Sequence, residues 1–147
     1  MPPTKVDATH AWHCECHVQA RVEAELLTKG YSISRLADTH SREHGVDING
    51  PDLKVSVKGF PGKNYVRGPK IGTPKTTSVH SQARQYFSHA TLDVVLYRSE
   101  HPTALVALGL PRMTTYLELW RKSKPVFKNN SIQAIFVDQT GVITWDP

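Results

Sequence analysis

The chain has few cysteines and no long apolar run. Only Cys14 and Cys16 carry thiols among 147 residues, and two such near neighbours in a helix form a poor disulfide, which favours a reducing compartment. No apolar stretch approaches the length of a membrane span, and "MPPTKVDATHAWH" lacks the hydrophobic core of a secretory signal. We therefore expect a cytoplasmic protein with no membrane partner.

Several catalytic motifs are also missing. The sequence contains no G-x-S-x-G elbow, phosphate loop or dinucleotide-binding glycine pattern. The cluster "HAWHCECH" offers imidazoles and thiols, which are zinc ligands. It lacks a second, distant ligand pair, and Cys-x-Cys on a helix directs its thiols to nearly opposite sides. The sequence therefore favours semi-buried cysteines beside exposed histidines over a zinc site.

Composition indicates a single globular domain over residues 1–147. The apolar fraction is 39%, and the charged fraction is 21%, which suits a soluble chain that buries a core. Lys and Arg number 18 against 13 Asp and Glu, a net charge of +5. This excess favours a polyanionic partner such as nucleic acid, although many small intracellular proteins are mildly basic without one.

Hydrophobic periodicity predicts alternating helices and strands. Val18, Val22 and Leu26 recur every four residues, and Gly30 stands where a helix would stop. "NGPD" predicts a turn. Further helices are expected in "SVHSQARQYFSHATLDVVLY" and "MTTYLELWRKS", and strands in "YSISRLADT", "VDI", "LKVSVKGF", "TALVALGLP", "IQAIFVD" and "GVITWDP". The order α-β-β-β-α-β-α-β, with a terminal strand after it, predicts an α/β fold in which helices flank a central mixed sheet. Phe87, Tyr116 and Trp120 are expected in its core.

The stretch "HGVDINGPDLKVSVKGF" gathers candidate catalytic residues. Asp47 precedes the predicted turn, and Ser56 and Lys58 share one face of the following strand because side chains alternate. The hairpin brings all three together, and the Val57 carbonyl lies between the latter two. Carboxylates hold Mg²⁺ for phosphodiester hydrolysis, and a lysine stabilises charge on phosphorus. Glu15, on the core-facing side of the first helix, is expected to reach the same place.

At these residues the chain resembles the PD-(D/E)XK, or restriction-endonuclease-like, nuclease superfamily, and is most similar to small stand-alone bacterial, phage or plasmid members. The resemblance is carried by the helix with Glu15, by "GVDI" and "VSVKGF", and by the helix "SQARQYFSHA". It implies an endonuclease that hydrolyses DNA with Mg²⁺ or Mn²⁺. Asp47 would bind the metal with Val57 and Glu15, Gln19 being the second choice to Glu15. Lys58 would be catalytic, and Gln82 would be the polar residue that recurs on the later helix.

Ser56 departs from the pattern, which has Glu or Asp there. Two alternatives keep the site active. Either Asp47, Glu15 and the Val57 carbonyl bind the metal while Ser56 holds a metal-bound water, or Glu43 or Asp52 supplies the missing acid. Alternatively, catalysis is lost and the fold serves as a nucleic-acid-binding or regulatory module. An aspartate before a turn and a lysine on a strand are common, so a protein-interaction domain, such as a mobile-element accessory factor, also stays open.

Residues 61–77 form a basic loop rich in Gly and Pro, which is either functional or a solvated connector. The residues expected to contact nucleic acid are Lys63, Arg67, Lys70, Lys75 and Arg84 at phosphates and Tyr65 stacked on a base. DNA is the expected partner, with RNA left open. Cleavage of both strands by so small a chain would require a homodimer.

Overall fold

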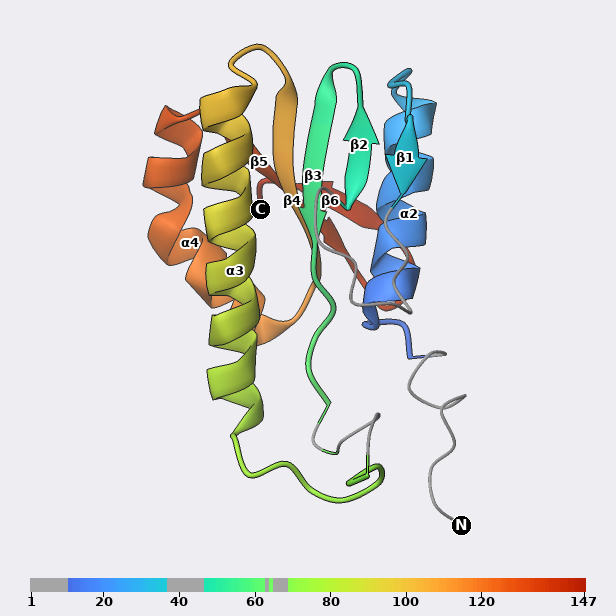
Figure 1. Ribbon diagram of the computed structural model, residues 1–147, viewed down its shortest axis with the longest axis vertical. Helices are drawn as coiled ribbons and strands as arrows, with labels where there is room; N and C mark the ends of the chain where they lie inside the picture. Colours follow the sequence, from blue (N-terminus) through green and yellow to red (C-terminus); the bar gives the residue numbers. More distant parts are fainter. Residues whose placement is uncertain (1–10, 37–46, 63, 65–68) are drawn as a thin grey trace.

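A computed structural model describes residues 11–36, 47–62, 64 and 69–147. One mixed sheet of six strands is covered by helix α2 on one face and by helices α3 and α4 on the other (Figure 1). In chain order the elements are α2 (Glu15–Thr28), β1 (Arg35–Leu36), β2 (Ile48–Gly50), β3 (Leu53–Val57), α3 (Val79–Glu100), β4 (Leu105–Pro111), α4 (Thr114–Asn129), β5 (Ile132–Val137) and β6 (Ile143–Trp145). The predicted α/β class, with helices flanking a mixed sheet, is confirmed.

The strands lie in the sheet in the same order as in the chain. β2 is antiparallel to β1 and β3, the strands β3, β4 and β5 run parallel, and β6 is antiparallel to β5. Parallel neighbours require a crossover connection, and α3 and α4 provide the two crossovers. The carboxyl ends of β3, β4 and β5 therefore meet at one edge, where Lys58 follows β3.

The element order agrees with the sequence prediction only in part. Of the strand expected in "YSISRLADT", the described residues show β1 alone, and its pairing with β2 is short. The turn is narrower than "NGPD", because Asn49 and Gly50 belong to β2 and leave Pro51–Asp52 as the connection. A side chain at Gly50 would lie 2.1 Å from the backbone oxygen of Ser32. This glycine therefore allows two backbone segments to approach, and it does not form the turn.

Each face of the sheet has its own hydrocarbon core. Val18, Val22 and Leu26 are fully buried against the β-sheet face that includes Val55 and Val57, as their spacing predicted. The buried side chains of the opposite core include Phe87, Tyr116 and Trp120, which also confirms the prediction. All of β3 is buried because helices cover both of its faces. Among the described residues, no helix is long and apolar enough to cross a membrane.

The cysteines at the start of α2 do not follow the sequence prediction. Cys14 and Cys16 are joined by a disulfide with their Cα atoms 5.5 Å apart. The prediction was wrong because it treated both residues as helical. Cys14 is the N-cap of α2 and has an extended backbone, with φ −71° and ψ 153°, so its side chain can turn toward that of Cys16.

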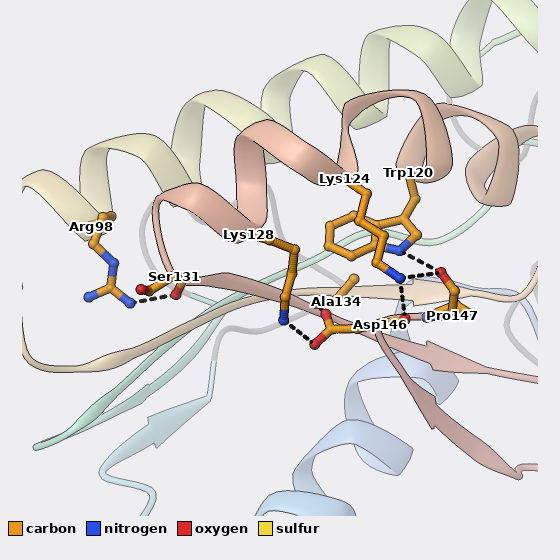
Figure 2. Close-up of polar contacts among 8 residues, drawn as sticks. All are labelled: Arg98, Trp120, Lys124, Lys128, Ser131, Ala134, Asp146 and Pro147. Atoms are coloured by element: carbon orange, nitrogen blue, oxygen red, sulfur yellow. Dashed lines mark hydrogen bonds and ion pairs between the residues drawn. The ribbon is translucent and has the colours of Figure 1, made fainter.

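Asp146 joins the end of β6 to β5 and α4 (Figure 2). Its backbone N–H donates to the carbonyl of Ala134 at 2.8 Å, and its carboxylate accepts the N–H of Ala134 at 2.7 Å. The same carboxylate pairs with Lys128 at 2.8 Å, and Lys124 donates to the Asp146 carbonyl at 2.9 Å. Asp146 has φ +48°, so the extended backbone of β6 ends here. Its carboxylate, and not a further backbone carbonyl, accepts the N–H of Ala134.

We expect Asp146→Ala to lower the free energy of unfolding by about 1–3 kcal/mol, because the Ala134 N–H loses its acceptor. Asp146→Asn is the matched control, since its amide oxygen still accepts that bond and Asn tolerates positive φ. It loses only the pair with Lys128, whose side chain is 42% exposed, and should cost at most about 1 kcal/mol. Urea unfolding measures both; equal losses would show that the ion pair dominates.

Candidate active site

Asp47 is held in a fixed position at the beginning of β2. Its side chain is 9% exposed, and its Oδ2 accepts a hydrogen bond from the backbone N–H of Val57 at 2.6 Å. The hairpin register sets this contact, since Ile48 pairs with Val55 and places Asp47 opposite the end of β3. The carboxylate therefore lies beside the strand that carries Ser56 and leads to Lys58.

Ser56 connects this strand to helix α3. It is fully buried, and its hydroxyl donates to Oδ2 of Asp93 at 3.0 Å. The neighbouring residues Val55 and Val57 pack in the core beneath α2, so Ser56 points to the opposite face, as the alternation predicted. A carboxylate from α3 thus stands next to the residue at which the nuclease pattern expects an acid.

The electrostatics of Asp47 show that these groups lie close together. Burial raises the pKa of the Asp47 carboxyl above its ordinary value of 3.8, and the negative charge of Asp93 raises it further. The Val57 N–H, the Lys58 ammonium and the Ser56 hydroxyl lower it without cancelling the effect of burial. Among the described residues, the charges that act on Asp47 come from Lys58 and Asp93.

Tyr97 lies one turn beyond Asp93 on α3 and faces the same carboxylates. Burial raises the pKa of its phenol, and Asp93, Asp47 and Glu100 raise it further, in that order. The phenol therefore stays protonated throughout the physiological pH range. It supplies a neutral polar group beside the two acids.

Lys58 extends β3 past its last residue. Its backbone N–H donates to the Gly109 carbonyl of β4 at 3.0 Å. Lys54 lies on the same face of the strand, but its ammonium donates to the carbonyl of Gly50 at 2.9 Å and to the side chain of Asn49, near the turn. Of the two lysines, Lys58 is therefore the one whose charge reaches Asp47.

The Val57 carbonyl points toward the Asp47 side of β3. The N–H and C=O of one strand residue point to the same side, and the next residue points to the other. The Val57 N–H donates to Asp47, whereas the Lys58 N–H donates toward β4. The carbonyl expected to act as a metal ligand is thus directed to the edge where Asp47 lies.

Glu15 is the first residue of α2 and lies beside the segment that follows Lys58. A side chain at Gly59 would lie 2.5 Å from the backbone nitrogen of Glu15, so the start of α2 packs on the residue after Lys58. The carbonyl of Gly59 accepts a hydrogen bond from the Tyr116 hydroxyl at 2.7 Å. Burial raises the pKa of the Tyr116 phenol, and the nearby Tyr86 and Glu15 raise it further, in that order. Glu15 therefore lies beside the segment beyond Lys58, and its charge acts on Tyr116.

Two other candidates lie away from the carboxylates. Gln82 accepts a hydrogen bond from Lys75 at 3.0 Å, and it lies three turns before Asp93 on the same face of α3, about 16 Å along the axis. Asp52 is exposed at the turn, about 13 Å along β3 from Ser56, so it does not replace the missing acid. Glu43 lies outside the described residues.

The basic residues are described in part. Lys70 and Arg84 are exposed, and Lys75 is partly buried beside Gln82. The other expected contacts, Lys63, Tyr65 and Arg67, lie outside the described residues.

Sequence reasoning missed Asp93. The residue is separated from Ser56 by 37 positions, and only the packing of α3 on β3 unites them. One signal was present: Asp93 interrupts an apolar stripe, with buried Ala90 three residues before it and buried Tyr97 four residues after it. A carboxylate at the margin of a buried helical face suggests a polar partner within the fold.

Comparisons of the chain with known protein families, with curated protein sequences and with solved structures find no match.

We expect Asp47→Asn to stabilise the metal-free protein at neutral pH. Asn can still accept the Val57 N–H, while the cost of burying a charge beside Asp93 disappears. Because folding raises the pKa of Asp47 above 3.8, the stability that this carboxyl contributes is complete below that pH and is lost as the pH rises through the folded pKa. The difference in Tm between variant and wild type should therefore be near zero in acid and grow toward neutrality.

Thermal unfolding across this pH range, without divalent ions, measures the difference. Asp52→Asn is the control, since it removes an exposed carboxylate at the turn of the same hairpin. A Tm difference that stays constant with pH would show that ionisation of Asp47 does not destabilise the folded protein.

Proposed function

We propose that this chain is a metal-dependent endonuclease of the PD-(D/E)XK class that hydrolyses phosphodiester bonds in DNA. The hydrogen bond from Ser56 to Asp93 carries the proposal. It accounts for the departure at Ser56, because the second carboxylate that the class requires comes from α3 and not from β3. The alternative of a binding module without activity rested on the absence of that acid.

The proposed restriction-endonuclease-like fold has support from the architecture. The chain places an antiparallel hairpin between a first helix and a crossover helix, within a mixed sheet covered on both faces. Asp47 directly precedes β2, and Lys58 directly follows β3, the strand with which β2 pairs. This placement of an acid and a lysine at the ends of paired strands supports the proposal.

The donor set suits a hard divalent cation. Asp47 and Asp93 offer carboxylate oxygens, and Val57 offers a carbonyl, which are ligands that Mg²⁺ and Mn²⁺ prefer. The raised pKa of Asp47 has burial and the nearby Asp93 charge as its causes. A cation would offset both, so the cluster is electrostatically better suited to a bound metal than to an empty site. When bound, Mg²⁺ would polarise the phosphate and favour deprotonation of the attacking water.

The protein groups have distinct roles in this proposal. Hydrolysis forms a bond from a water oxygen to phosphorus and breaks one P–O ester bond, and the leaving oxygen takes up a proton. Lys58 would stabilise the negative charge that develops on the phosphate oxygens. Ser56 and the Val57 N–H would hold the two carboxylates in place.

Lys70 and Arg84 are exposed and would be available for contacts with nucleic-acid phosphates. Phosphate contacts of this kind give affinity that falls with salt and does not depend on sequence. Cutting both strands would require a second copy of the chain.

Purified protein should nick plasmid DNA with Mg²⁺ or Mn²⁺ and not with a chelator. Asp47→Ala should abolish cleavage, and Lys58→Met should lower kcat roughly 10²–10³-fold, as the loss of one charge-stabilising donor does. Agarose electrophoresis of the nicked form measures the rate.

Matched controls separate the site from its surroundings. Lys54→Met changes the other lysine on the same strand face, and Glu100→Gln removes an exposed acid of α3. Both variants should keep near wild-type rates once circular dichroism shows that they fold. Cleavage that persists in Asp47→Ala and Lys58→Met would exclude this site.

A reciprocal exchange tests the role of Asp93. Asp93→Ser alone should lose cleavage, and Ser56→Glu combined with Asp93→Ser should recover part of it, because the carboxylate then returns from the strand. The rate of each protein with Mn²⁺ gives the comparison. Full activity of the single variant Asp93→Ser would rule out Asp93 as the second acid.

A further inference from the structure

A second group of potential metal ligands lies at the start of α2. The Sγ atoms of Cys14 and Cys16 and a ring nitrogen of His17 all lie within 4.8 Å of one another. We propose that, once its disulfide is reduced, this triad binds a soft divalent cation of the Zn²⁺ type, and that the disulfide closes the site. The site is independent of the proposed nuclease centre, which uses hard oxygen ligands.

The backbone at Cys14 makes the convergence possible. Two thiols one residue apart inside a helix point to nearly opposite sides. Cys14 is extended at the N-cap, whereas Cys16 is helical, so their sulfur atoms meet on one side. Ligands of a tetrahedral Zn²⁺ lie roughly 3.5–4 Å apart, which the present spacing accommodates with small side-chain rotations.

The surroundings favour thiolates. The beginning of a helix stabilises negative charge, and the backbone N–H of His17 already donates to the Cys14 sulfur at 3.5 Å. In the described part of the chain, Nε2 of His17 and Nδ1 of His13 are buried without a hydrogen-bond partner. A buried polar atom left without a partner has a cost, and coordination through Nε2 would give that atom of His17 a partner.

The chemistry of the donor set selects the metal. Two thiolates and one imidazole suit Zn²⁺, and they disfavour Mg²⁺, which prefers oxygen. Three protein ligands leave a fourth position for water or another ligand.

Reduction must come from outside the protein. The disulfide takes up two electrons from a dithiol or a phosphine and becomes two thiols; the two protons come from the dithiol or, with a phosphine, from water. A dithiol is itself oxidised to a disulfide, and a phosphine becomes the phosphine oxide with oxygen from water. Metal binding then releases the two thiol protons and changes no oxidation state.

Titration of the whole chain with Co²⁺ tests the site, because Co²⁺ reports thiolate ligands through a sulfur-to-metal charge-transfer band. Protein reduced with a phosphine and then freed of it should bind one Co²⁺ per chain with this band, and Zn²⁺ should displace it. The disulfide form should show no band. Cys14→Ser and Cys16→Ser should each weaken the band and the binding, and His17→Asn should lower affinity at least about 10- to 100-fold, as even loss of an outer-shell partner does.

His89→Asn is the control, since this exposed histidine of α3 should leave binding unchanged. Circular dichroism verifies that each variant keeps the fold. The proposal is overturned if reduced wild-type protein gives no charge-transfer band, or if Cys14→Ser and Cys16→Ser both bind Co²⁺ as tightly as the wild type. The titration measures Co²⁺ binding and uses no DNA, so the result of the titration holds whether or not the chain cleaves DNA.

Discussion

The burial of the Asp47 carboxylate beside Asp93 is the constraint on which the candidate site depends. Two acids at the interface of a sheet and a helix repel each other and lose hydration. Three groups from β3 and its extension compensate: the Val57 N–H, the Ser56 hydroxyl and the Lys58 ammonium. An arrangement with this cost is typical of functional sites, where perturbed pKa values gather.

The two faces of the sheet have different roles. The side chains of β3 that face α2 are hydrocarbon, and the one from Ser56 toward α3 is polar. Elements from both layers contact Gly59, which follows Lys58. The start of α2 lies against this residue, and its carbonyl accepts a hydrogen bond from the Tyr116 hydroxyl of α4. The position of the lysine therefore depends on packing from both layers.

Much of the fold was predictable because its signals are local. The spacing of Val18, Val22 and Leu26 identified the buried face of α2, and strand alternation placed Ser56 opposite Val55 and Val57. The errors came from residues judged by proximity in the sequence. Asp52 was one candidate for the missing acid because it is close to Ser56 in the chain, but the length of β3 separates the two. Gly50 suggested a turn, whereas its small size serves a backbone contact with Ser32.

By itself, the sequence determined the α/β class, the hairpin and the strand face on which its polar residues lie, since periodicity and alternation depend on neighbours along the chain. Only the tertiary structure decided which acid accompanies Asp47, because the packing of α3 on β3 unites Asp93 with Ser56 across 37 positions. It also decided that Cys14 and Cys16 meet, because the extended backbone of the N-cap changes the direction of one side chain. Interactions between distant elements leave no periodic trace in the sequence.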